Sequence, residues 1–153
     1  MEPEPPGWQR FTRPGFAVEF SYPPVTPRGH SVERSEEPFR DYARVHLSSP
    51  DRQELYVEVV RFHELQPEDE YRQHRAYLEQ RFGSDSITPL ARTKLLEWPA
   101  WAYGFRWDEG DRPMERAVLL LDIAGDTYRV IYDPRSPVNA QVLRTLELSR
   151  SSP

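Results

Sequence analysis

Histidines, serines and carboxylates are the residues of this sequence that could perform catalysis or hold a metal ion. The histidines stand apart from one another, and none belongs to an HExxH pattern. Because the chain has no cysteine, a metal ion would need histidine and carboxylate ligands, and scattered histidines do not supply a set of them. We therefore expect no metal ion and no other cofactor. The histidines are His30, His46, His63 and His74.

Nucleophile and nucleotide-binding motifs are absent from the sequence, which contains no GxSxG, P-loop or GxGxxG pattern. The run "HLSSPD" places two serines between His46 and Asp51, but these residues are also typical of a proline-containing hairpin loop. A Ser-His-Asp triad is recognised by its geometry, so the sequence leaves one open.

Acidic residues gather in two runs that local structure explains. "PEDE" at positions 67–70 suits the first turn of a helix, where carboxylates complement the helix dipole. "DEGD" at positions 108–111 lacks the spacing of a calcium loop, and a solvated turn accounts for it. No pair of acids stands out as a general acid–base couple. The sequence therefore favours a protein without catalytic activity but does not decide the question.

Composition and charge limit the partners of the chain. Its 153 residues fit one domain, and its net charge of −5 opposes nonspecific binding to nucleic acid or anionic lipid. No apolar run approaches the roughly 20 residues of a membrane span. The start, "MEPEPPGWQR", lacks the basic and apolar regions of a signal peptide, which indicates a cytoplasmic protein. An exported protein trimmed of its leader would look the same.

The chain divides into an arm, one domain and a short tail. Residues 1–14 carry four prolines and are expected to form an extended proline-rich arm, from which Trp8 and Phe11 could dock on the domain. The single domain is expected at residues 15–150, and residues 151–153 form the tail.

Alternating hydrophobicity predicts the strands of the first half. The run "GFAVEFSYP" alternates as a half-buried strand does, and "HSVERSE" is a weaker second strand. Runs 40–47 and 55–63 predict a hairpin across "SSPDRQE". Its expected register pairs Leu47 with Leu55, Val45 with Val57 and Arg44 with Glu58, because these pairs match apolar and opposite-charge faces.

Two helices and four further strands follow. The segment 66–83 predicts the one long helix, with Pro67 in its first turn and Gly83 at its end. "SPVNAQVLRTLELS" predicts a closing helix with Ser136 as N-cap and Pro137 at N1. The expected strands are 91–98 and 100–108, separated by a break at Pro99, and 114–123 and 127–133, joined by a type II′ turn at Gly125-Asp126 that pairs Asp122 with Arg129.

The predicted order is therefore four strands, a helix, four strands and a helix (ββββαββββα). Consecutive hairpins make the central sheet mainly antiparallel, and the two helices must cover at least one of its faces. The sequence thus predicts an α+β fold.

Five segments carry a resemblance to a known group of folds: the early strand "GFAVEFSYP", the mid-chain helix, the "EWPAWAYGFRW" strand, the "LLLDIAGDTYRVIYD" hairpin and the closing helix. In this order they resemble the PsbP/Mog1/DcrB-like group over residues 14–149. Many members carry a Gly-Trp after the first strand's proline, where this chain reads "PPVTPRG". The resemblance implies an α-β-α sandwich around an antiparallel sheet. It also implies a binding role, because most characterised members bind proteins and the members share no active site. Characterised members include photosystem extrinsic subunits, a partner of a small nuclear GTPase, bacterial lipoproteins and secretion-effector chaperones.

Aromatic residues are concentrated in "EWPAWAYGFRW" at 97–107, which holds three of the four tryptophans. On a strand, four rings of this run share one face, and two interpretations stay open. The rings either form a core covered by a helix or line a groove or association surface with arginines at its rim. The residues of this candidate surface are Trp98, Trp101, Tyr103, Phe105, Arg106, Trp107, Arg112 and Arg116.

These observations favour a noncatalytic binding or assembly domain that holds a protein partner or a second copy of itself. It would use the aromatic-rich sheet face or the end near the "DEGDRP" turn. The alternative is a small-molecule pocket, with or without catalysis, between sheet and helix. Its lining groups would be Tyr22, Tyr42, Arg44, His46 and Tyr56. Nucleic-acid binding is not expected, because no basic stripe is present.

Overall fold

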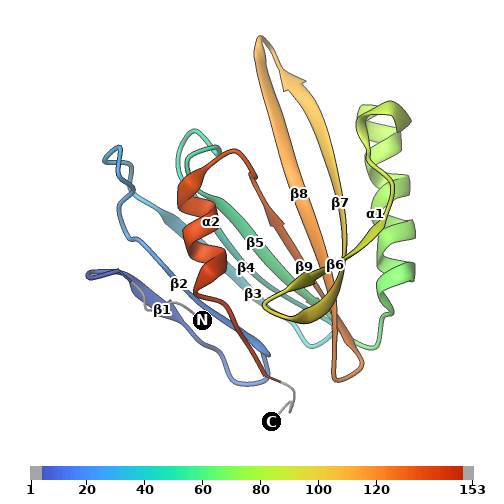
Figure 1. Cartoon of the computed structure of the whole chain (residues 1–153), viewed down its shortest axis with the longest axis horizontal. Helices are drawn as coiled ribbons and strands as arrows, with labels where there is room; N and C mark the ends of the chain where they lie inside the picture. Colours follow the sequence, from blue (N-terminus) through green and yellow to red (C-terminus); the bar gives the residue numbers. More distant parts are fainter. Residues whose placement is uncertain (1–4, 150–153) are drawn as a thin grey trace.

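A seven-stranded antiparallel sheet runs through the centre of the protein, which a computed structural model describes from residue 5 to residue 149 (Figure 1). The strands lie in the order β3-β4-β5-β9-β8-β7-β6, and each neighbouring pair is antiparallel. Their bounds are β3 (Glu33–Pro38), β4 (Tyr42–Ser48), β5 (Tyr56–Phe62), β6 (Ala91–Leu95), β7 (Trp98–Glu109), β8 (Arg112–Ile123) and β9 (Asp126–Tyr132).

Helices and a small second sheet cover the two faces of the main sheet. One face packs against α1, and the other packs against α2 and a three-stranded sheet of order β1-β2-β10. The bounds are β1 (Gln9–Phe11), β2 (Val18–Tyr22), α1 (Pro67–Phe82), the 3-10 turn η1 (Ser84–Ser86), α2 (Pro137–Arg144) and β10 (Glu147–Leu148). The predicted α+β class is confirmed. The observed order differs from ββββαββββα because β1 precedes the predicted strands and β10 follows the closing helix.

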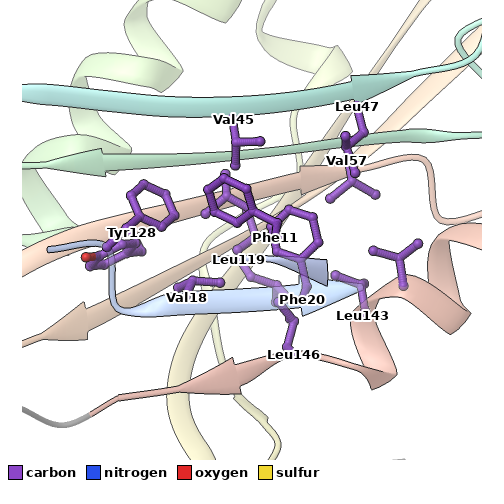
Figure 2. Packing of buried hydrophobic residues seen from close by; sticks show 14 of the residues in the cluster. Phe11, Val18, Phe20, Val45, Leu47, Val57, Leu119, Tyr128, Leu143 and Leu146 are labelled. Carbon is purple, nitrogen blue, oxygen red and sulfur yellow. The ribbon is translucent and has the colours of Figure 1, made fainter. Parts of the chain in front are cut away.

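The core between the main sheet and α2 contains the residues that the first strand was expected to bury. Phe20 and Val18 of β2 pack with Val45 and Val57 of the sheet, and Leu143 of α2 closes the layer (Figure 2). Apolar side chains from three layers thus bury one another, which is the main driving force for the fold.

Part of the proline-rich arm belongs to this core. Phe11 of β1 is fully buried, with its ring 5.1 Å from that of Phe20 and 5.6 Å from that of Phe16. Trp8 packs against the same cluster, so both aromatic residues dock as expected. Residues 1–4 and the predicted tail at 151–153 lie outside the described residues.

The long helix forms where the sequence predicts it. Pro67 occupies its first turn, and Gly83 ends it with φ 91°, a backbone conformation that glycine adopts without strain. His74 and Leu78 are buried against the sheet, whereas Tyr77 points to solvent. Neither helix formed by residues 5–149 is long and apolar enough to cross a membrane.

The predicted registers of the two hairpins are wrong by two residues. In the first, Val45 pairs with Val59 and Leu47 with Val57, while Leu55 lies outside the strand. The loop causes this shift, because the Ser49 amide donates to the Leu55 carbonyl and the Leu55 amide donates to the Ser49 hydroxyl. A shift of two keeps every side chain on its predicted face.

In the second hairpin the turn type was wrong. Ala124 and Gly125 form the two-residue loop with φ 55° and 87°, so Ile123 pairs with Asp126 and Asp122 with Thr127. Positive φ at both positions is the pattern of a type I′ turn, whose twist matches that of the strands it joins.

The predicted break at Pro99 was also wrong. The chain reverses at Leu96 and Glu97, with φ 51° and 67°, and Pro99 lies within β7 opposite Lys94. Pairing of β7 with β8 begins only at Trp101, so the missing amide of Pro99 removes no ladder bond on that side.

Candidate functional site

The two central rings of the four-ring row of β7 lie in a core covered by α1, and Trp101 and Trp107 pack against that core half-buried. Tyr103 is 5% exposed and Phe105 is 8% exposed. Phe82 of α1 stacks on Phe105 and on Trp107 with centroid distances of 6.1 and 5.2 Å, and His74 hydrogen-bonds the Tyr103 hydroxyl. Burial and the positive charge of Arg129 disfavour a protonated imidazole and lower the pKa of His74 to about 3, so this imidazole is neutral. The first of the two interpretations of the row is the one that the structure supports.

The other residues of the candidate surface separate from one another. Trp98 packs against the α2 side of the sheet, and Arg106 is exposed. Arg112 lies at the hairpin tip, where it donates to the Asp51 carbonyl at 2.9 Å. Arg116 is 2% exposed and cannot form a rim. The eight residues therefore do not form one surface.

Four of the five residues expected to line a small-molecule pocket share the α1 face of the sheet. Tyr42, Arg44, His46 and Tyr56 stand on β4 and β5, where the His46 and Tyr56 rings lie 4.7 Å apart. Burial lowers the pKa of His46. Tyr22 is separate, because it belongs to β2 in the small sheet.

A row of alternating charges crosses this face from β3 to α1, and the sequence analysis missed it. Arg44 lies 3.5 Å from Glu37 and 2.6 Å from Glu58. Arg129 lies 3.6 Å from Glu58 and 3.2 Å from Glu70 of α1. Burial raises the pKa of Glu70 despite the nearby Arg129. Each internal charge of the row is paired on both sides, as buried charges require.

A cleft of about 540 Å³ lies along α2 and is lined by residues of that helix and of the β4–β5 turn. Figure 1 shows α2 beside the end of the sheet at which this turn lies. Val138, Gln141 and Arg144 line it at a spacing of three, so one face of α2 forms a wall. The Ser136 hydroxyl donates to the Glu54 carbonyl at 2.5 Å and ties the start of α2 to the β4–β5 turn. The remaining lining residues are Pro27, Arg28, Asp51, Gln53, Asp133, Arg135 and Pro137.

The carboxylates that line the cleft are held within the fold. Asp51 accepts hydrogen bonds from the Ser49 hydroxyl at 2.6 Å and from the amides of Gln53 and Glu54 at 3.0 and 3.1 Å. Partial burial of Asp51 opposes ionisation, but these hydrogen bonds lower its pKa to about 2.

Glu54 is tied in the same way. It accepts from the Thr26 hydroxyl and from the Arg28 amide, and its Oε1 lies 2.9 Å from His30 Nδ1. Burial alone would raise the pKa of Glu54, and the hydrogen bonds lower it.

Asp133 joins the cleft to the buried Arg116. Its Oδ2 lies 3.3 Å from Arg116 and 2.9 Å from Arg135, and its Oδ1 accepts the Arg135 amide at 2.9 Å. Arg135 also donates to the Pro113 carbonyl at 3.0 Å, so its guanidinium is fixed.

The Arg28 side chain differs from Arg135. It is exposed on the loop after β2, and among residues 5–149 no ion pair or hydrogen bond holds its guanidinium. Arg144 is exposed at the other end of α2. The cleft thus offers the Arg28 guanidinium, while its acids are already engaged.

A second cleft of about 480 Å³ shares Arg135 and is lined by two predicted residues, Arg106 and Trp107. It lies at the hairpin formed by β7 and β8.

Catalytic groups do not assemble around either cleft in the described part of the chain. The Ser49 hydroxyl donates to Asp51 and the Ser136 hydroxyl donates to a backbone carbonyl, so neither hydroxyl donates to a histidine. No group of three histidine or acidic residues between positions 5 and 149 could hold a metal ion. Local turn chemistry accounts for the "HLSSPD" residues, of which the Ser49 hydroxyl and the Asp51 carboxylate hydrogen-bond each other.

The fold and the cleft define an α+β antiparallel sandwich with a charged groove along its second helix. No protein-family model and no curated protein matches the chain. Its fold is similar to that of a crystal structure from Bacteroides thetaiotaomicron, with a TM-score of 0.58 and 15% sequence identity. The similarity covers 96% of this chain and 50% of that one, so this chain spans half the length of the Bacteroides protein. At this identity the comparison shows the fold alone.

Proposed function

We propose that this protein is a noncatalytic binding domain that receives an extended segment of a protein partner in the cleft along α2. The observation that carries the proposal is this cleft, in which Arg28 is open to solvent while Asp51, Glu54 and Asp133 are engaged within the fold. Carboxylates that already accept hydrogen bonds within the fold are poorly placed to transfer protons to a substrate, so the site suits ligand binding better than acid–base catalysis.

The dimensions of the cleft suit a short stretch of polypeptide. The eight residues of α2 span about 12 Å, which is the length of roughly four extended residues. The resemblance to the PsbP/Mog1/DcrB-like group, most of whose characterised members bind proteins, supports the same role and stays a prediction. The end near the "DEGDRP" turn, expected from the sequence to hold a partner, adjoins the cleft through the contact of Arg112 with Asp51.

Site-specific photocrosslinking tests this proposal. A photoreactive phenylalanine analogue at Gln141, which lines the cleft, should crosslink a partner in cells, and the same analogue at Ala140 should not. Both residues are exposed on α2, but Ala140 is not part of the lining. The identified partner is then titrated against the purified domain by calorimetry.

The Gln141→Trp variant should fill the cleft and weaken the partner's affinity at least about tenfold, or 1.4 kcal/mol. The Ala140→Trp variant should bind as the original domain does. Equal affinity of both variants for the partner would place the interface elsewhere and refute the proposal.

The volume of the cleft supports a second candidate, a small molecule. About 540 Å³ falls within the range of roughly 300–1,000 Å³ that ligand pockets occupy. Native mass spectrometry of the purified domain separates the two candidates. A copurified mass that disappears in Gln141→Trp but persists in Ala140→Trp would favour the small molecule.

A further inference from the structure

We propose that the group recognised in the α2 cleft is an anion, a carboxylate or a phosphate, bound through Arg28. This inference rests on the proposed function and adds the chemistry of the ligand. It follows from which donors and acceptors of the cleft are already used.

Most carboxylate acceptors of the cleft are engaged within the fold. The Ser49 hydroxyl and two loop amides all donate to Oδ1 of Asp51, while the Thr26 hydroxyl and the Arg28 amide donate to the two oxygens of Glu54. A cationic or donor-rich ligand would compete with these bonds at Glu54 and at Oδ1 of Asp51.

The Arg28 side chain is a hydrogen-bond donor that the fold leaves available to a ligand. The Arg28 guanidinium carries five N–H groups, and no ion pair or hydrogen bond from the described residues holds it. Gln141, which is exposed, and Arg144 line the same cleft as Arg28. A planar or tetrahedral anion matches the fork geometry of a guanidinium better than any neutral group does.

The position of the lining charges also favours an anion at Arg28. Three arginines and three carboxylates line the cleft, so their formal charges cancel. Arg135 and the buried Arg116 both pair with Asp133, and Glu115 lies 3.9 Å from Arg135, so these two cations are compensated locally. Arg28 has no such ion pair among residues 5–149.

The two anions would come from different sources. A carboxylate would belong to an acidic side chain or the C-terminus of a partner, and a phosphate would belong to a phosphorylated group. Three small probes distinguish them: succinate, inorganic phosphate and the neutral succinamide. Each is titrated into the 15N-labelled domain at constant ionic strength, and the amide resonances of Gly29, Gln53 and Gln141 report on the cleft.

We expect saturable shifts of these amides with succinate, phosphate or both, and none with succinamide. The stronger of the two anions identifies the source. The Arg28→Gln variant should weaken that binding about tenfold, the size of one lost charge-assisted contact. The matched Arg72→Gln variant removes an exposed arginine of α1 and should leave the affinity unchanged.

Several outcomes overturn the inference. These are equal shifts with succinamide, no shift with either anion, or unchanged affinity in Arg28→Gln. If the Gln141 crosslink to a partner persists while the anions fail, the anion inference falls and the proposed function stands. Loss of the crosslink together with saturable anion shifts would leave an anion site and remove the protein partner.

Discussion

The guanidinium of Arg116 lies 3.8 Å from the centre of the Tyr56 ring, in the interior of the protein. The same side chain contacts Asp133 at 3.3 Å and donates to the Arg52 carbonyl at 2.8 Å. One arginine of β8 therefore joins β5, the β4–β5 turn and the segment that leads into α2. The β4–β5 turn and the segment that leads into α2 form part of the cleft, so Arg116 positions these walls without lining the cleft.

Removal of Arg116 should destabilise the fold strongly. The Arg116→Ala variant leaves the buried Asp133 without one of its two cations, and breaking a buried pair in this way typically costs about 3–5 kcal/mol. Urea denaturation of the purified variants measures the difference. The Arg112→Ala variant removes an arginine with a 38% exposed side chain and should cost less than about 1 kcal/mol. Similar losses in the free energy of unfolding for the two variants would show that the buried contacts of Arg116 do not stabilise the fold.

The cover that α1 provides over the ring row can be tested with a residue of the helix. Leu78 is 2% exposed and packs in the cluster of Tyr103 and Phe105. Leu78→Ala should therefore cost about 2–5 kcal/mol, through lost burial and the cavity left behind. Gln73→Ala changes an exposed position of the same helix and should shift the stability by less than about 0.5 kcal/mol. A cost below about 1 kcal/mol for Leu78→Ala would show that the row needs no cover from α1.

The sequence predicts the elements of this fold better than their pairing. Alternation marks a strand and its faces wherever one side is buried, so Val45, Val57 and the rings of β7 could be assigned to faces. Register depends on the side-chain bonds of the turns. The hydroxyl of Ser49 accepts a hydrogen bond from the amide of Leu55, and this contact shifts the pairing register of the hairpin by two residues from the predicted one. No periodicity encodes such a contact.

The cleft was not found from the sequence because its residues come from three separate segments of the chain. Arg28, Asp51, Asp133 and Arg144 share no motif, and only the fold brings them together. One local signal was available. The run "DPRSP" joins a strand to a helix and contains Asp133 and Arg135, and such junctions often carry binding residues.

Ionised Asp51 stabilises the fold, and the protein should become less stable when acid protonates this carboxylate. Its pKa is 3.8 in the unfolded chain and about 2 in the fold, so its contribution is present above pH 3.8 and is lost as the pH falls toward 2. Because Asp51 is partly solvated, we expect Asp51→Asn to cost only about 1 kcal/mol at pH 7. Its cost should decrease between pH 4 and pH 2 in denaturation experiments. A cost that stays constant over this interval would contradict the low pKa of Asp51.

His74 should dominate the loss of stability at mildly acidic pH. The unfolded imidazole titrates at 6.5, while burial and Arg129 hold the folded pKa near 3. The unfolded chain therefore binds a proton first, and the stability that neutral His74 permits is fully present above pH 6.5 and declines as the pH falls toward 3. From these two values the free energy of unfolding should drop by about 2 kcal/mol between pH 7 and pH 5.

The His74→Gln variant removes the titrating group and keeps a polar partner for the Tyr103 hydroxyl. We expect its free energy of unfolding to lose most of this pH dependence, although it is lower overall; the remaining slope comes from His46, whose pKa burial also lowers. The His63→Gln variant is the control, because the His63 side chain is 36% exposed and its substitution should leave the slope in place. Chemical denaturation at several pH values measures both slopes. A slope that survives undiminished in His74→Gln would mean that His74 is solvated and that α1 does not seal the ring row.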